Sequence, residues 1–277
     1  MKVYKALSIA GSDPSGGAGI QADLKTFSSL GVYGATVITA VVDENTVSVT
    51  DVHPVPVPFV QGQIRSVLDD VGADAIKIGM LHSSELILAV KETLSAYSIE
   101  NIVLDPVMVA TSGDKLLQDE AIETLKKDLI PFVRIITPNI PEAEILLGEK
   151  ITEQAMLPGF AKKLSQSFGG KVSVLLKAGH LSEEELIDIF YNAETGELIE
   201  LPSRRIFTKN THGTGCTLSS AVAAYLARGF SLNESVTYGK EYIYQAILAG
   251  TNFSIGKGHG PVHHFWNVLN WGEGLRK

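Results

Sequence analysis

Residues 210–222 read NTHGTGCTLSSAV and place a glycine-rich turn directly before a patterned helix. Two glycines, Gly213 and Gly215, allow a tight turn and leave the backbone N–H groups around Thr214 uncovered. The first N–H groups of a helix have no partner inside it, and the helix dipole adds partial positive charge there. Such a helix start is a ready anion site, and a phosphoryl group in transfer is a natural occupant.

Cys216 lies in the same turn and is the only cysteine among the 277 residues. A thiol beside a helix N-terminus and a bound cation is expected to have a lowered pKa, which suits a general base. The other interpretation is a buried, inert cysteine in an ordinary glycine-rich loop. A single cysteine excludes an internal disulfide and suits a reducing compartment.

Outward from this turn, apolar β-rich runs alternate with helical patterns. Strand-helix alternation at this spacing predicts βαβ units and a largely parallel sheet that is covered on both faces. Without a Pro- or Ser-rich linker, residues 1–277 are expected to form one domain. A hairpin around Thr195-Gly196 is predicted near the end of the sheet, over 186–192 and 197–201. The other strands are expected at 6–10, 35–42, 75–78, 102–104, 134–137 and 172–177, and helices at 18–30, 57–71, 84–97, 119–129, 152–168, 216–228 and 232–249.

Composition narrows the class of partner. The net charge is −8, which argues against a nucleic-acid or anionic-membrane surface as the main partner. A hydrophobic fraction of 45% is enough for a full core. The apolar run near the N-terminus is too short for a signal peptide or a membrane span, so a cytoplasmic protein is expected.

Polar clusters follow several predicted strands, which is where ligands bind in open α/β sheets. Residues 11–23, GSDPSGGAGIQAD, come directly after the first strand. Their glycines let a small ligand approach the backbone, and Asp23 is placed to accept a hydrogen bond from a ligand hydroxyl. The alternative is a capping loop with Asp23 exposed near the positive helix end.

Three further strand ends carry residues suited to phosphate chemistry. Asp105 and Glu142 are hard oxygen ligands that suit Mg²⁺ held through waters, and Asn139 is placed to reach a nucleotide phosphate. Lys177 ends the last long strand, where its ammonium group suits a phosphate. Alternatively, Glu142 is a first-turn acid favoured by the helix dipole, and Lys177 is a solvated strand-end residue.

The glycine- and histidine-rich segment 256–264, GKGHGPVHH, is interpreted as a loop at the rim of the site or a simple tail. Its three histidines suggest a metal site, but two of them are adjacent and no carboxylate is near in sequence.

Together these stretches resemble the hydroxymethylpyrimidine and phosphomethylpyrimidine kinases, a branch of the ribokinase-like superfamily. They span nearly the whole chain in the family's order. Cys216 replaces the aspartate of most sugar kinases, which marks the pyrimidine and pyridoxal branch. The resembling segments are 10–27 (AGSDPSGGAGIQADLKTF), 77–81 (KIGML), 104–117 (LDPVMVATSGDKLL), 137–143 (TPNIPEA), 209–219 (KNTHGTGCTLS) and 256–264.

The resemblance implies a three-layer α/β/α sandwich with a mainly parallel central sheet. It implies ATP-dependent phosphorylation of 4-amino-5-hydroxymethyl-2-methylpyrimidine, and then of its monophosphate, in thiamine biosynthesis. It also implies a homodimer, a small pyrimidine substrate, and no nucleic-acid or membrane partner.

The resemblance also assigns roles to residues. Cys216 is implied as the base for the hydroxymethyl group. The backbone N–H groups from Gly213 to Cys216 are implied to stabilise the transferred phosphoryl group. The remaining implied roles are ATP contacts by Lys177 and Asn139, Mg²⁺ binding by Asp105 and Glu142, and a pyrimidine pocket lined by Gly11, Asp23, Glu44, Met80 and Val107.

Glu44 departs from the family pattern, which usually has glutamine there. A glutamine amide both donates and accepts, and so matches a ring nitrogen beside an amino group, whereas an ionised glutamate only accepts. Glu44 still fits if it or the aminopyrimidine carries a proton.

Two other functions stay open from the sequence. A pyridoxal or pyridoxine kinase shares the GTGC turn, although residues 111–117 and the GPVHH segment look like the thiamine branch. A non-catalytic sensor of the pyrimidine phosphate is the other alternative, and the presence of Lys177, the GTGC turn and Asp105 speaks against it.

Overall fold

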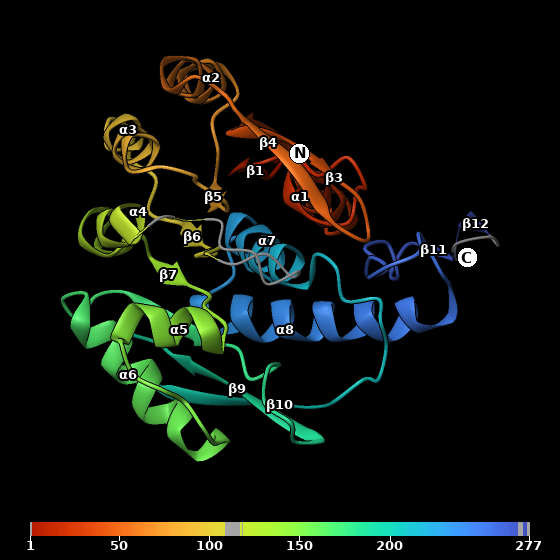
Figure 1. Ribbon diagram of the computed structural model, residues 1–277. Coiled ribbons are helices and arrows are strands. Elements are labelled where there is room, and N and C mark those ends of the chain that lie inside the picture. Colours follow the sequence, from red (N-terminus) through yellow and green to blue (C-terminus); the bar gives the residue numbers. More distant parts are fainter. Residues whose placement is uncertain (1, 109–116, 118, 271–273, 276–277) are drawn as a thin grey trace.

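The computed structural model describes residues 2–108, 117, 119–270 and 274–275. An eight-stranded sheet in the order β10-β9-β8-β7-β6-β5-β1-β2 forms the centre (Figure 1). The strands from β2 to β8 along this order are parallel, and β9 and β10 are antiparallel. The bounds are β1 (Lys5–Ala10), β2 (Tyr33–Ile38), β5 (Ala75–Ile78), β6 (Ile102–Leu104), β7 (Ile135–Ile136), β8 (Ser173–Leu176), β9 (Glu185–Tyr191) and β10 (Leu198–Arg204).

The sheet is covered on both faces because its central strands are apolar on both sides. In β6, Ile102 and Leu104 belong to one buried cluster and Val103 to the other. Helices cover both faces in Figure 1, which confirms the expected three-layer α/β/α sandwich. One face packs α2 (Val57–Asp70), α3 (Ser84–Leu94), α4 (Asp119–Thr124), α5 (Ile140–Leu147) and α6 (Leu157–Ser167), and the other packs α1 (Gly19–Ser29), α7 (Thr214–Ala227) and α8 (Leu232–Ala249).

Short elements complete the described chain. A π-helical turn, Leu125–Leu129, continues α4, and 3-10 turns lie at Ile130–Phe132, Gln154–Met156 and Gly250–Asn252. Near the C-terminus, β11 (Leu269–Asn270) pairs with β12 (Gly274–Leu275). No helix in the described ranges is both long and apolar enough to cross a membrane.

The predicted strand 35–42 is wrong at its end, because the chain leaves the sheet at Thr39. The Thr39 N–H donates to Ala10 and its hydroxyl donates to the Met80 carbonyl, which turns the chain across the end of β1. The following residues form a separate antiparallel hairpin of β3 (Ala40–Glu44) and β4 (Val49–Pro54). This hairpin carries Glu44 out beyond the carboxyl end of the sheet.

Candidate active site

The GTGC turn begins α7 with a left-handed glycine. Gly213 has φ of 79° and is the N-cap of α7, and no side chain caps the helix. A side chain at 213 is excluded, since its Cβ would lie 1.7 Å from the Gly17 carbonyl oxygen. The glycine loop after β1 therefore packs directly against the start of α7. No side chain caps the first N–H groups of this helix, which suits an anion site.

Asp105 and Lys177 converge on this helix start from the ends of β6 and β8. Lys177 Nζ lies 3.2 Å from Asp105 Oδ1, and both side chains are largely buried. A Cβ built on Gly215 would lie 3.2 Å from Asp105 Oδ2 and 3.6 Å from Lys177 Nζ. The Thr137 hydroxyl donates to Asp105 at 3.1 Å, which fixes the carboxylate. The structure thus brings the predicted lysine and aspartate together under the first turn of α7.

Glu142 and Asn139 cap α5 at the same carboxyl edge of the sheet. Asn139 Oδ1 accepts from the Glu142 N–H at 2.9 Å, and Glu142 Oε2 accepts from the Asn139 N–H at 2.8 Å. These two hydrogen bonds form a capping box, which confirms the alternative that Glu142 is an acid in the first turn of the helix. Asn139 also forms a parallel bridge with Lys177, which places it at the same strand end.

The charge around Glu142 fits a divalent cation. Burial raises the pKa of Glu142 to about 7; Lys177 opposes this rise, and Asp105 adds to it. Two buried carboxylates therefore share one ammonium group, which leaves surplus negative charge. Mg²⁺ is commonly held by one or two carboxylates together with waters and phosphates, so Asp105 and Glu142 suit it in kind and number.

The prediction of a lowered pKa for the Cys216 thiol is wrong in this structure. Burial raises its pKa to about 11, and the negative charges of Asp23 and Asp105 add to the rise. Lys77 and a backbone contact with Gly19 oppose it without cancelling it. The helix dipole and a bound cation favour a thiolate, whereas the burial of the thiol and the carboxylates beneath the turn disfavour it.

Asp23 lies in a buried cluster of polar side chains, and its predicted contact with the substrate finds no support there. Its side chain and that of Lys77 are fully buried, and Lys77 Nζ lies 2.8 Å from Asp23 Oδ2. The carboxylate also accepts from Ser8 at 2.5 Å and from Ser220 at 2.6 Å. With its oxygens occupied by protein donors, Asp23 holds β1, β5 and α7 to α1.

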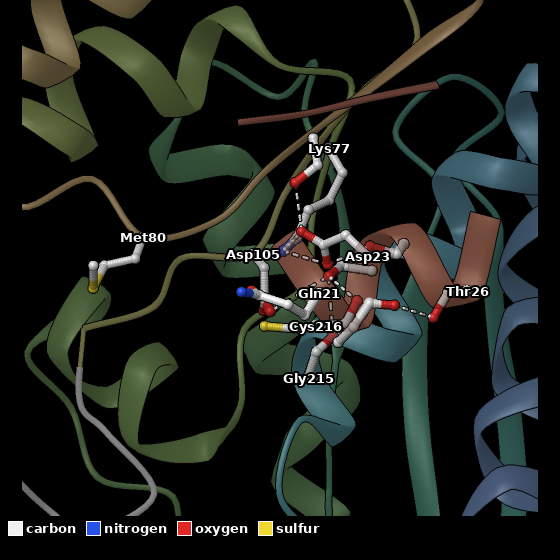
Figure 2. Close-up of polar contacts among 12 residues, drawn as sticks. Gln21, Asp23, Thr26, Lys77, Met80, Asp105, Gly215 and Cys216 are labelled. Carbon is white, nitrogen blue, oxygen red and sulfur yellow. Dashed lines mark hydrogen bonds and ion pairs between the residues drawn. The ribbon is translucent and has the colours of Figure 1, made fainter. Parts of the chain in front are cut away.

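Two predicted pocket residues meet at the end of β1. A Cβ on Gly11 would lie 2.7 Å from Met80 Cε and 3.8 Å from Val42 Cγ2. Figure 2 shows Met80 apart from the cluster around Asp23. Val107 is half-buried two residues after Asp105, and its N–H donates to the Asp105 carbonyl. Residues 109–116 of the resembling segment 104–117 lie outside the described residues.

Asp13 and His212 stand beside Glu44 and were missed by the sequence reasoning. His212 Nε2 lies 2.8 Å from Asp13 Oδ2 and 3.8 Å from Glu44 Oε1. The three groups are close enough to hold a cation. Asp13 already accepts from the N–H groups of Gly17 and Ala18, so the arrangement is that of an ion pair. Both residues lie in quoted glycine-rich stretches, and the only sequence signal was their position beside the turns.

Asp13, His212 and Glu44 shift one another's pKa values. Burial raises the pKa of Asp13, but hydrogen bonds from His212, Ser15 and Ala18 outweigh it and leave the pKa well below the usual range. Burial lowers the pKa of His212, but Asp13 and Glu44 raise it overall. Burial and the charge of Asp13 raise the pKa of Glu44. An imidazolium group beside two carboxylates is the favoured state, with Glu44 the more easily protonated acid.

The profile of a known family matches most of the chain, from residue 13 to residue 263, and that family is phosphomethylpyrimidine kinase. This chain belongs to the phosphomethylpyrimidine kinase family. A hydroxymethylpyrimidine/phosphomethylpyrimidine kinase of Rhizobium meliloti is 48% identical over 261 residues, which is 94% of this chain and 96% of that protein.

Solved structures agree in fold. A phosphomethylpyrimidine kinase from Clostridium difficile is 44% identical with a TM-score of 0.77, over 89% of this chain and 100% of that chain. A pyridoxal kinase from Staphylococcus aureus in complex with AMP-PCP and pyridoxal is 34% identical with a TM-score of 0.83, over 96% of each chain. The expected ribokinase-like architecture is confirmed by these neighbours.

Proposed function

We propose that this protein is an ATP-dependent kinase that phosphorylates 4-amino-5-hydroxymethyl-2-methylpyrimidine and then its monophosphate, in thiamine biosynthesis. One observation carries the proposal: the uncapped start of α7 lies against the Asp105–Lys177 pair. A Cβ built on Gly215 would lie 3.2 Å from Asp105 Oδ2 and 3.6 Å from Lys177 Nζ. Relatives named as kinases of this substrate at 48% identity support it.

Phosphoryl transfer needs mainly positioning and charge stabilisation, and the site supplies both. The backbone N–H groups from Gly213 to Cys216 stabilise negative charge on the transferred group. Lys177 places its ammonium group beside the same turn, where it draws the ATP phosphates toward the acceptor. Asn139, bridged to Lys177, reaches the phosphates from the neighbouring strand end.

Mg²⁺ would be held by Asp105 and Glu142 through its waters, and it would neutralise phosphate charge during transfer. A bound cation would also stabilise the ionised form of Glu142, which burial and the charge of Asp105 disfavour.

Cys216 is the proposed base for the hydroxymethyl group. With a pKa raised to about 11, its thiol is protonated near neutral pH in the absence of added charges. A Mg²⁺ held by Asp105 and Glu142 would add positive charge near the thiol and so would lower its pKa. The second phosphorylation depends less on a base, since its nucleophile is a phosphate that is already largely ionised.

The pyrimidine would lie between the end of β1 and the β3–β4 hairpin. Gly11 and Met80 form one wall there, and Val107 is proposed to complete it. Glu44 faces this space from the hairpin and would share one proton with the aminopyrimidine. Asp23 is left out of this proposed pocket, because its oxygens already accept hydrogen bonds from Lys77 and Ser220.

A pyridoxal kinase is the second candidate, because pyridoxal kinases share the fold at 34% identity. Identities of 48% and 44% to pyrimidine kinases favour the first candidate. We further propose that residues 1–277 form one domain, that the protein is a cytoplasmic homodimer, and that it has no nucleic-acid or membrane partner.

Turnover of ATP with each candidate alcohol tests the proposal. The purified protein with Mg²⁺ should convert the hydroxymethylpyrimidine to its monophosphate and then its diphosphate, as resolved by chromatography. Faster turnover of pyridoxal would assign the second candidate. Monophosphate without diphosphate under saturating ATP would reduce the activity to one step, and no turnover of any alcohol would favour a sensor.

A further inference from the structure

Outside the central sheet, the β3–β4 hairpin makes few backbone contacts with the rest of the chain. Its strands pair only with each other among the described strands. At its base, the Ser12 N–H donates to the Ala40 carbonyl at 2.9 Å, and Val55 donates to Thr39 at 3.0 Å. A two-stranded hairpin alone is marginally stable, so the position of its far end, where Glu44 lies, needs another support.

Thr46 supplies that support at the tip of the hairpin. Its hydroxyl oxygen accepts from the Lys257 and Gly258 N–H groups, each at 3.2 Å. Its carbonyl accepts from the His259 N–H at 2.8 Å. Three successive amides of the glycine-rich segment thus converge on one threonine. This segment, residues 256–260, is called the latch loop below.

The glycines of the latch loop are required by the contact. A Cβ on Gly258 would lie 1.9 Å from the Thr46 carbonyl oxygen, and one on Gly256 would lie 2.2 Å from the Thr46 hydroxyl. Gly256 also has φ of 76°, which side chains rarely adopt. Glycines at 256 and 258 therefore allow the latch loop to approach Thr46 without steric overlap.

The other end of the latch loop joins the anion site. The Gly260 carbonyl accepts from the His212 N–H at 3.0 Å, and His212 bridges with Pro261. A Cβ on Gly260 would lie 2.2 Å from Asn210 Oδ1. His212 directly precedes Gly213, so the loop ties the hairpin tip to the turn that receives the phosphoryl group. The blue C-terminal segment lies beside the hairpin tip in Figure 1.

We infer that Thr46 is a positioning residue for the pyrimidine, acting through the latch loop to hold Glu44 beside His212. Glu44 lies two residues before Thr46 at an irregular point of the hairpin register. Its Oε1 lies 3.8 Å from His212 Nε2. The position of the hairpin tip therefore sets the distance between Glu44 and the residue that directly precedes Gly213. This inference rests on the proposed function.

Thr46→Val tests the inference, because valine keeps the branched shape and the backbone bond to His259 but removes the hydroxyl acceptor. We expect the KM for the pyrimidine to rise about tenfold, the effect of losing one or two ordinary hydrogen bonds. The kcat and the KM for ATP should stay within about twofold, since the phosphate contacts lie elsewhere. Hydrogen exchange at the Lys257 and Gly258 amides should become faster.

Thr50→Val is the matched control on the same hairpin. The Thr50 hydroxyl donates to the Asp43 carbonyl within the hairpin and makes no contact with the latch loop among the described residues. Its kinetics and the amide exchange of the latch loop should match wild type. Gly258→Ala disturbs the contact from the other side and should raise the pyrimidine KM in the same selective way.

Three results would overturn the inference. They are an unchanged pyrimidine KM in Thr46→Val, equal rises in the KM for pyrimidine and for ATP, and unchanged exchange at the two amides. Failure of the proposed function is separate, since it appears as no pyrimidine turnover by wild type. In that case the exchange of the Lys257 and Gly258 amides still decides whether the Thr46 hydroxyl holds the loop.

Discussion

At the scale of single residues, the protonation of Glu44 can be tested through its effect on pyrimidine binding. It is half-buried beside Asp13, which raises its pKa, and it faces a pocket proposed for an aminopyrimidine. An ionised carboxylate and a neutral ring nitrogen are both acceptors, so they cannot hydrogen-bond to each other. Glu44 and the aminopyrimidine therefore bind well only while one of them carries a proton at this contact. The pyrimidine KM should therefore rise as pH rises and that proton is lost.

Glu44→Gln should retain pyrimidine binding and flatten this pH dependence, because the amide donates and accepts without titrating. The measurement is the KM for the pyrimidine from pH 6 to pH 9 in both proteins, at saturating Mg·ATP. Identical pH profiles of the KM in wild type and variant would show that residue 44 does not recognise the pyrimidine ring.

Cys216 can be followed directly, since it is the only cysteine. Cys216→Ala should lose most of the first phosphorylation, by about a hundredfold, which is typical for removal of a general base. ATP affinity and much of the second step should remain, because the backbone N–H groups are unaffected. Cys216→Asp should recover part of the first step if proton abstraction is the role.

Rates of the two steps, measured separately from alcohol and from monophosphate, check this expectation. Equal loss of both steps in Cys216→Ala would point to a collapsed anion site instead of a lost base. In wild type without nucleotide, alkylation by iodoacetamide should be slow below pH 9, because the thiol pKa is raised to about 11.

At the scale of elements, the sequence predicted what periodicity and turn chemistry determine. The strands at residues 75–78 and 102–104 were predicted with their observed bounds, since both are short runs dominated by apolar residues and buried on two faces. Convergence of Asp105, Lys177 and the GTGC turn also followed, because parallel strands end at one edge.

What the sequence could not supply depends on contacts between distant segments. The break at Thr39 depends on hydrogen bonds to Ala10 and Met80, which no local pattern reveals. Asp23 was expected in a pocket, but its partner Lys77 lies 54 residues away on another strand. The expected direction of the Cys216 pKa shift is wrong for the same reason, since the burial that raises the pKa, and the carboxylates that add to it, come from other elements.

The start of α5 combines a structural and a chemical role in Glu142, and pH separates them. The Glu142 pKa is raised to about 7, so Mg²⁺ must compete with a proton below that pH. Apparent Mg²⁺ affinity in the kinase assay should fall by about tenfold from pH 8 to pH 6. Glu142→Gln keeps an acceptor for the Asn139 N–H, and it should bind Mg²⁺ more weakly with little pH dependence.

Stability gives an independent readout of the same group. An acid whose folded pKa is raised stabilises the fold below its unfolded pKa near 4.5, and that contribution is lost as pH rises through about 7. Metal-free Glu142→Gln should therefore gain stability relative to wild type at pH 8 but not at pH 4.5, as measured by urea unfolding. The same difference in stability at both pH values would mean that the pKa of Glu142 is not raised in the folded protein.

At the scale of the whole molecule, glycine loops and a buried ion pair hold the site together. The loops after β1 and before α7 interlock at Gly17 and Gly213, and the latch loop joins the second of them to the hairpin. Beneath them, Asp23 of α1 binds Lys77 of β5, Ser8 of β1 and Ser220 of α7. Ser220 lies one turn after Cys216, so this cluster sets where the anion site sits on the sheet.

The buried pair yields the last prediction. Burial disfavours a charged Lys77, but the charge of Asp23 outweighs this and raises the Lys77 pKa, so Lys77 stays charged. Lys77→Met should lower the free energy of unfolding by about 3–5 kcal/mol, because it leaves Asp23 buried and charged without its cation. Asp23→Asn should also destabilise, by leaving Lys77 without its anion.

The double variant Asp23→Asn/Lys77→Met removes both charges and should be more stable than the sum of the single effects predicts. Urea unfolding of the four proteins measures the coupling, and the rate of the first phosphorylation shows whether α7 keeps its place. A double variant that regains stability but not rate would mean that the ion pair positions the anion site. Strictly additive losses would contradict a coupled pair, and a double variant with full rate would leave the pair with a role in folding alone.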